Sequence, residues 1–251
     1  MSAIDAPGRH GRRPRVVALG DSISCGEGVG VSVHLAHTWA AVVAHSLGGE
    51  LDLLATRGAR IADVRLSQLP LALARRPDVA TLIVGLNDIS RGGWDEPRMR
   101  ADLHTVVGAL RAQGVTVVLG RLHDPTALLP MPARIRQRIG ARIAAVNAAV
   151  DASIGPDVLL LDLARIPQLR NRGSWAVDRV HPSIAGHRAV AEAALDILEA
   201  NDVRVAERVP IRPAAARCSR LAEVRWLARY GAPYLVRNLD RVRQPVGADA
   251  G

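Results

Sequence analysis

The sequence contains no phenylalanine and no lysine, and it has two cysteines in 251 residues. Cys25 and Cys218 are too few and too far apart for a disulfide framework or a zinc-binding spacing, so we expect neither a metal nor another cofactor. No run of 18 apolar residues occurs, and the N-terminal residues lack the apolar core of a secretion signal. These absences argue against a membrane-spanning or disulfide-rich secreted protein and predict a soluble, cytoplasmic one.

The net charge of +9 is concentrated at the two ends of the chain. Residues 1–15 hold four arginines against one acidic residue, and residues 203–243 hold ten arginines against three. Between them, residues 16–202 carry nineteen arginines and nineteen acidic residues, so this part is neutral. An enzyme that acts on nucleic acid would place its basic stripe on the folded body. We therefore expect no nucleic acid partner.

Short aliphatic runs alternate with longer segments of helical periodicity, which is typical of βα units that build a parallel sheet. The aliphatic runs cover residues 15–19, 51–55, 79–84, 115–120 and 158–161. The helical segments cover residues 34–47, 61–74, 96–112, 133–154 and 183–200. The pattern predicts an α/β fold, a three-layer α/β/α sandwich around a five-stranded parallel sheet of flavodoxin-like type with strand order 2-1-3-4-5.

Polar residues follow the predicted strands at their carboxyl ends, where sites form in sheets of this type. Ser22 comes directly after the first strand in Gly20-Asp21-Ser22, where the glycine permits a tight turn. Asp178 and His181 lie three residues apart before the last helix, a spacing that lets the carboxylate orient the imidazole. A serine hydroxyl needs such an oriented base. The pattern predicts Ser22 as nucleophile, His181 as base and Asp178 as the orienting acid.

Donors for an oxyanion are present in neighbouring loops. Gly58 follows the second strand and Asn87 follows the third. A backbone N–H from Gly58 and a side-chain N–H from Asn87 would add to the backbone N–H of Ser22. These three donors would form an oxyanion hole.

Four segments in this order resemble the four blocks of the SGNH/GDSL hydrolase superfamily, over about residues 15–200. They are Gly20-Asp21-Ser22-Ile23-Ser24, Gly58 in Ala55-Thr56-Arg57-Gly58, Gly85-Leu86-Asn87-Asp88 and Asp178-Arg179-Val180-His181-Pro182. Each block alone is weak or moderate evidence, whereas all four at the ends of successive strands are strong evidence. The resemblance implies that Ser22 is the nucleophile and that His181 and Asp178 complete a triad. It also implies that Gly58 and Asn87 donate to the oxyanion.

Several of these residues also have a structural interpretation. Alone, Ser22 would more often cap the helix that follows it. Cys25 is a tempting second nucleophile, but nothing near it in the sequence would lower its pKa, so we favour a packed thiol. Asp21 and Asp88 are expected to hold their turns. His34 and His37 could face one metal, but without a carboxylate at ligand spacing we favour solvated surface.

Further side chains are candidates for a substrate pocket. Arg91 and Trp94 follow the Asn87 loop and could form its rim. Trp175 is equally suited to lining the pocket and to packing against the triad loop. The residues after the fourth strand, Arg121, His123 and Asp124, would either contact substrate or stabilise their own loop.

The chain divides into a basic N-terminal tail (1–14), the hydrolase domain (15–202) and a basic, partly helical C-terminal appendage (203–251). In the appendage, a linker-like stretch (209–216) precedes a helical pattern (219–239) interrupted at residues 231–233. We favour packing of its apolar side, which carries Trp226, Tyr230 and Tyr234, on the body or on a second subunit of a homodimer. The alternative is peripheral contact with an anionic membrane through residues 217–240.

Together these features predict a serine esterase that hydrolyses a small-molecule acyl ester through an acyl-enzyme. An acyltransferase or a thioesterase would use the same residues, because the difference lies in which molecule accepts or carries the acyl group. A non-catalytic binding protein with this fold is the remaining alternative, and the presence of Ser22, Asn87 and His181 argues against it.

Overall fold

The computed structural model describes residues 12–28, 31–127, 132–208 and 220–231. Five parallel strands form the central sheet in the order β4-β1-β5-β6-β7, which confirms the predicted order. They are β1 (Arg15–Gly20), β4 (Glu50–Leu53), β5 (Val79–Ile83), β6 (Thr116–Arg121) and β7 (Val158–Asp162). The central strand β5 is buried along its whole length, as expected for a strand covered on both faces.

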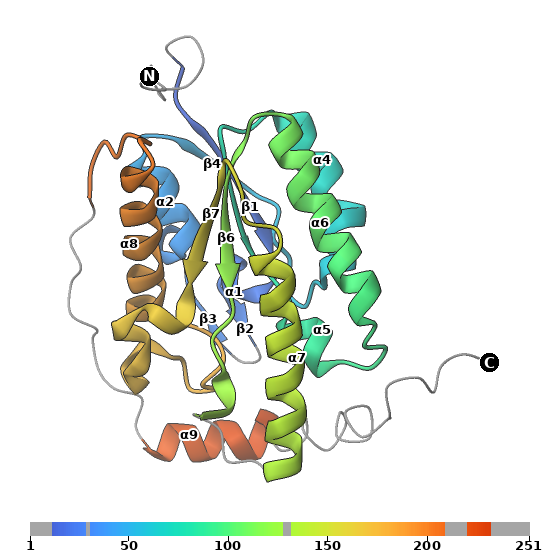
Figure 1. The fold of residues 1–251 in the computed structure, drawn as a ribbon. Helices are drawn as coiled ribbons and strands as arrows, with labels where there is room; N and C mark the ends of the chain where they lie inside the picture. The colour runs from blue at the N-terminus through green and yellow to red at the C-terminus, as the bar shows by residue number, and fades with distance from the viewer. Residues whose placement is uncertain (1–11, 29–30, 128–131, 209–219, 232–251) are drawn as a thin grey trace.

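Helices cover both faces of this sheet, which confirms the three-layer architecture (Figure 1). One face carries α2 (Trp39–Ser46) and α8 (Ile184–Ala200). The other carries α4 (Leu69–Arg75), α6 (Glu96–Ala112) and α7 (Ala133–Asp151). The bounds of α6 match the prediction, because Asp95 caps its first turn by accepting a hydrogen bond from the Arg98 N–H at 3.0 Å.

Two of the predicted helices are interrupted. Residues 34–47 form a 3₁₀ turn, η1 (Leu35–His37), followed by α2, because Thr38 is extended and caps α2 through its hydroxyl. Residues 61–74 form α3 (Ile61–Asp63), a π turn η2 (Val64–Gln68) and α4. A π turn inside a helix redirects the side chains that follow it and often occurs at functional sites.

Several short elements at the carboxyl end of the sheet are too small for periodicity to predict. They are α1 (Ser22–Cys25), the antiparallel hairpin of β2 (Glu27–Gly28) and β3 (Val31–Ser32), and α5 (Leu86–Ser90). Short 3₁₀ turns follow the last two strands: η3 (Pro125–Ala127), η4 (Leu163–Arg165), η5 (Pro167–Arg170) and η6 (Arg172–Ser174).

A buried histidine joins the two helices on one face of the sheet. His187 of α8 is 1% exposed, and its Nδ1 accepts a hydrogen bond from the Trp39 N–H at the start of α2, at 3.2 Å. Burial lowers the pKa of His187 to about 3, with a smaller contribution from the charge of His181. His187 is therefore neutral at physiological pH and keeps the lone pair that this contact requires.

The start of the predicted appendage belongs to the packed body. The N–H groups of Ala206 and Glu207 donate to the Ser46 carbonyl, at 2.8 and 3.1 Å. Arg208 forms ion pairs with three acidic residues of α8, Glu192, Asp196 and Glu199. The packed structure thus extends at least six residues beyond the predicted boundary at residue 202.

Farther along, residues 220–231 are helical, as α9 (Arg220–Trp226) and the π turn η7 (Leu227–Gly231). Leu221 and Val224 of α9 are 60% and 63% exposed in the single chain, and packing of the apolar side on a second subunit stays a prediction. The rest of the appendage, including Tyr234, lies outside the described residues. No described helix is both long enough and apolar enough to cross a membrane.

Candidate active site

The turn after β1 places Ser22 at the carboxyl edge of the sheet. Gly20 has φ +114°, and a Cβ there would collide with the Ile83 carbonyl of β5, so this position requires glycine. Gln68 holds the turn from η2: its Oε1 accepts from the Gly20 N–H at 2.8 Å, and its Nε2 donates to the Gly20 carbonyl at 2.9 Å. Ser22 then opens α1.

The structure brings the three predicted catalytic side chains into one chain of hydrogen bonds. Ser22 Oγ lies 2.8 Å from His181 Nε2, and His181 Nδ1 lies 2.5 Å from Asp178 Oδ2. A carboxylate can only accept, so the proton on the imidazole belongs on Nδ1, and Nε2 is left to accept from the serine hydroxyl. This is the geometry that a serine nucleophile and its base require.

The loop that carries Asp178 and His181 is fixed by its own backbone. Asp178 is 3% exposed, and its second oxygen accepts from the N–H groups of Val180 and His181, at 3.0 and 2.9 Å. Arg179, which follows Asp178, has φ +60° and donates from Nη1 to the Arg172 carbonyl at 2.7 Å. The carboxylate thus orients its own loop as well as the imidazole.

Gly28 lies against the ring of His181, a contact that the sequence did not indicate. A Cβ added at Gly28 would lie 2.6 Å from His181 Nδ1, 2.8 Å from Cγ and 2.9 Å from Cε1. These three atoms span one side of the imidazole, so the backbone of the β2–β3 hairpin covers that side. Glycine at this position lets the hairpin approach the base closely.

Asp21 and Asn87 tie the nucleophile turn to the loop after β5. Asp21 is 1% exposed; its Oδ1 accepts from the Ile23 N–H at 3.0 Å and its Oδ2 from Asn87 Nδ2 at 3.1 Å. Burial raises the pKa of Asp21 to about 6, although these hydrogen bonds and the charge of His181 oppose the rise. Asn87 Nδ2 also donates to the Ala59 carbonyl at 3.1 Å, so both of its hydrogens are engaged within the protein.

Asp88 has the structural position expected of it. Its carboxylate accepts from the Ile61 N–H at the start of α3, at 3.2 Å to the nearer oxygen. Burial raises the pKa of Asp88 to about 6. The pair Asn87 and Asp88 therefore fastens α5 to the loop that contains Gly58.

Two predicted oxyanion donors remain open in the described structure. Among the described residues, neither the Ser22 N–H nor the Gly58 N–H donates a hydrogen bond. Gly58 has φ +80°, and a Cβ there would lie 2.5 Å from Nη2 of Arg91. The predicted rim residue Arg91 thus lies directly against a predicted oxyanion donor.

The two tryptophans named as pocket candidates both contact the body of the protein. Trp175 is 2% exposed, donates from Nε1 to the Leu169 carbonyl at 2.7 Å and stacks against the ring of His123 at 4.2 Å between centroids. This contact favours the packing role for Trp175 and a loop-stabilising role for His123, whose pKa is lowered by burial to about 4. Trp94 is half-buried against the core and lies under Arg142, 5.3 Å from the guanidinium carbon to the ring centroid.

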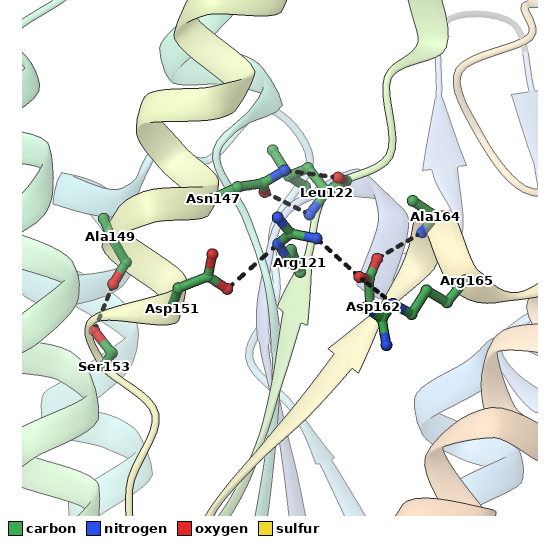
Figure 2. Close-up of polar contacts among 9 residues, drawn as sticks. All are labelled: Arg121, Leu122, Asn147, Ala149, Asp151, Ser153, Asp162, Ala164 and Arg165. Carbon is green, nitrogen blue, oxygen red and sulfur yellow. Dashed lines mark hydrogen bonds and ion pairs between the residues drawn. The ribbon is translucent and has the colours of Figure 1, made fainter.

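Arg121 and Asp124 also stabilise their own surroundings. Arg121 lies between two carboxylates, 2.9 Å from Asp162 and 3.3 Å from Asp151 (Figure 2). Asp124 accepts from the Thr126 N–H at 2.8 Å. A cavity of about 650 Å³ opens beside Arg121 and Asp162, between β7 and α8, and no triad residue lines it.

The remaining candidates are Cys25 as a nucleophile and the pair His34 and His37 as metal ligands. Cys25 is half-buried, and burial raises the pKa of its thiol, which disfavours the thiolate. His34 and His37 contact each other edge to face, and no group of three metal-ligating side chains occurs in the part of the chain that the structure describes.

The sequence matches a known protein-family model over most of its length. Residues 18–189 match the model of the GDSL-like lipase/acylhydrolase family. No curated protein sequence matches the chain.

Among solved structures, the fold is similar to that of TesA, with 22% identity, a TM-score of 0.59 and coverage of 74% of this chain and 99% of TesA. It is also similar to the esterase EstA from Pseudoalteromonas sp., at 15% identity and TM-score 0.55, covering 74% and 97% of the two chains. A catalytic mutant of Axe2, an acetylxylan esterase from Geobacillus stearothermophilus, gives 19% identity and a TM-score of 0.57, covering 74% and 94%. At these identities the likeness shows a shared fold.

Proposed function

This chain belongs to the GDSL-like lipase/acylhydrolase family, and from that premise we propose that it is a serine esterase that hydrolyses a carboxylic acyl ester. The observation that carries the proposal is the unbroken contact from Ser22 Oγ to His181 Nε2, at 2.8 Å, and from His181 Nδ1 to Asp178. Such a chain makes a hydroxyl nucleophilic at neutral pH, where the hydroxyl alone reacts poorly.

The proposed reaction has two steps. In the first, His181 accepts the proton of Ser22 Oγ as that oxygen bonds to the ester carbonyl carbon, and the imidazolium then protonates the departing alkoxide. In the second, His181 takes a proton from water, whose oxygen attacks the acyl-enzyme. The proton then returns to Ser22 as the acid leaves. Asp178 stays ionised and stabilises the imidazolium in both steps.

The N–H groups of Ser22 and Gly58 are the proposed oxyanion donors, because both are open at the carboxyl edge of the sheet. We keep Asn87 as a third proposed donor with one condition. Its amide hydrogens bond Asp21 and Ala59, so one of them must be shared with the oxyanion or turned toward it. The bond to the neutral Ala59 carbonyl is the weaker of the two and is the one we expect to yield.

Transfer of the acyl group to an alcohol or a thiol is the second candidate, because it needs the same acyl-enzyme. We expect the protein to release p-nitrophenol from p-nitrophenyl esters, with a rapid first turnover of about one product per enzyme when deacylation is slower than acylation. The test is a series of acyl chain lengths with and without added alcohol or thiol. Absence of hydrolysis and of transfer across the series would contradict the proposal.

A further inference from the structure

A cationic side chain lies against the Cα of Gly58, whose N–H is one of the proposed oxyanion donors. The Cβ position of Gly58 lies 2.5 Å from Nη2 of Arg91 and 3.2 Å from both Cζ and Nη1. The guanidinium therefore fills the space that a side chain at residue 58 would occupy. Glycine at this position makes room for Arg91 as well as permitting the left-handed turn.

The backbone around Arg91 is held in place. The Arg91 N–H donates to the Asn87 carbonyl at 3.2 Å, so the turn that carries the proposed donor Asn87 also carries Arg91. The buried Arg142 donates to the Ile89 carbonyl at 2.8 Å and packs over Trp94, which fixes the chain on both sides of Arg91. The backbone that carries Arg91 is therefore fixed, and its side chain reaches Gly58 from this loop.

The charge of Arg91 has no counter-ion within the described residues: no carboxylate forms an ion pair with it there. The charge of Arg91 contributes to lowering the pKa of Asp21, but the Asp21 carboxyl is buried and already accepts hydrogen bonds from Ile23 and Asn87. Arg57, next to Gly58, adds a second, exposed cation to the same loop. A half-buried guanidinium with a planar set of donors and no internal acid is suited to bind an anion from outside.

We propose that Arg91 determines specificity, by selecting esters that carry an anionic group, a carboxylate or a phosphate, beside the scissile ester. This inference rests on the proposed esterase function. Arg91 binds the anion through charge-assisted hydrogen bonds while the neighbouring donors hold the carbonyl oxygen.

The test compares neutral and anionic esters in matched sets. On the acyl side, mono-4-nitrophenyl succinate is compared with 4-nitrophenyl butyrate. On the alcohol side, 4-acetoxybenzoate and 4-acetoxyphenyl phosphate are compared with phenyl acetate. We expect the wild-type protein to prefer an anionic member by about tenfold in kcat/KM. Higher ionic strength should reduce this preference.

Arg91→Gln is expected to lower the preference about tenfold, mainly through KM for the anionic ester, and to abolish its salt dependence. Arg91→Lys keeps the charge and should retain part of the preference. The control Arg75→Gln removes an exposed charge at the opposite edge of the sheet and should leave the preference unchanged.

The following results would distinguish failure of the specificity role of Arg91 from failure of the proposed esterase function. If Arg91→Gln slows neutral and anionic esters equally, or if the wild-type protein shows no anionic preference in any set, the specificity role is wrong although the esterase stands. If the folded wild-type protein hydrolyses none of these esters, the proposed function itself fails. An anionic preference that survives in Arg91→Gln would assign the anion to another residue.

Discussion

Ser22→Ala is expected to lower kcat for ester hydrolysis by roughly 10⁴-fold or more, because no other group then forms the acyl-enzyme. The expected loss lies in kcat, since the hydroxyl contributes little to binding the ground state. The fold should survive, because the Ser22 hydroxyl bonds His181 and alanine is a good helix former at the start of α1. Steady-state kinetics with p-nitrophenyl esters and thermal unfolding would measure both effects.

Ser24→Ala is the matched control for this prediction. Ser24 lies in the same short helix, is fully buried, and its hydroxyl has no hydrogen-bond partner within the described residues. Removing that hydroxyl should leave both the activity and the melting temperature near their wild-type values. If Ser22→Ala retained wild-type kcat, or if Ser24→Ala lost activity to the same degree, Ser22 would not be the nucleophile.

Gly28→Ala should lower kcat by roughly 100-fold, the cost of displacing a catalytic group by about 1 Å. The new methyl group would lie within 2.9 Å of three atoms of the His181 ring, so the ring or the hairpin must move. His181 is held at both nitrogens, by Ser22 and by Asp178, and any shift of the ring lengthens at least one of these contacts. The structure thus predicts a kinetic defect from a residue that has no chemical role.

Gly173→Ala provides the comparison. Gly173 lies in η6, upstream of Asp178 and His181, and a Cβ there would meet nothing within 4 Å. It should retain wild-type kcat with an unchanged melting temperature. A Gly28→Ala protein that melts normally and keeps wild-type kcat would show that the hairpin does not restrain His181, whereas a large loss of melting temperature in both variants would point to general destabilisation.

The sequence predicted the sheet well because each strand is a nearly unbroken aliphatic run. Val79–Ile83 is buried along its whole length, so its composition reports burial directly. The alternation of strands and helices indicated a parallel sheet, and the flavodoxin-like type supplied the strand order. The candidate triad residues were expected to meet because the carboxyl ends of parallel strands lie at one edge. Ser22 and His181 are 159 residues apart in sequence, and this rule predicted their encounter only together with the Asp178–His181 spacing and the four-block resemblance.

The residues that sequence reasoning missed act through contacts with no local signal. Gly28 lies in a two-residue strand, too short for periodicity, and touches a ring more than 150 residues away. Gln68 sits inside a helical pattern, and the π turn that directs it to Gly20 has no sequence signature. A hydrophobic helix with one polar residue on its inner face was the available hint, since a buried glutamine needs partners.

Aromatic and charged side chains were the least predictable, because their sequence positions fit two roles. Trp175 packs against the ring of His123, and Arg121 forms ion pairs with Asp151 and Asp162. Both side chains therefore contact residues of the protein body. Arg91 was predicted at the rim, but its contact with Gly58 depends on the turn that follows Asn87.

Covalent labelling tests the central claim most directly. The full chain would be treated with a p-nitrophenyl alkylphosphonate, which a serine hydrolase attacks with release of p-nitrophenol, and the modified residue identified by peptide mass mapping. The account predicts one phosphonyl group on Ser22, and labelling at least 100-fold slower in His181→Ala, which lacks the base. A label on Cys25, or none on Ser22 in protein that hydrolyses esters, would contradict the account.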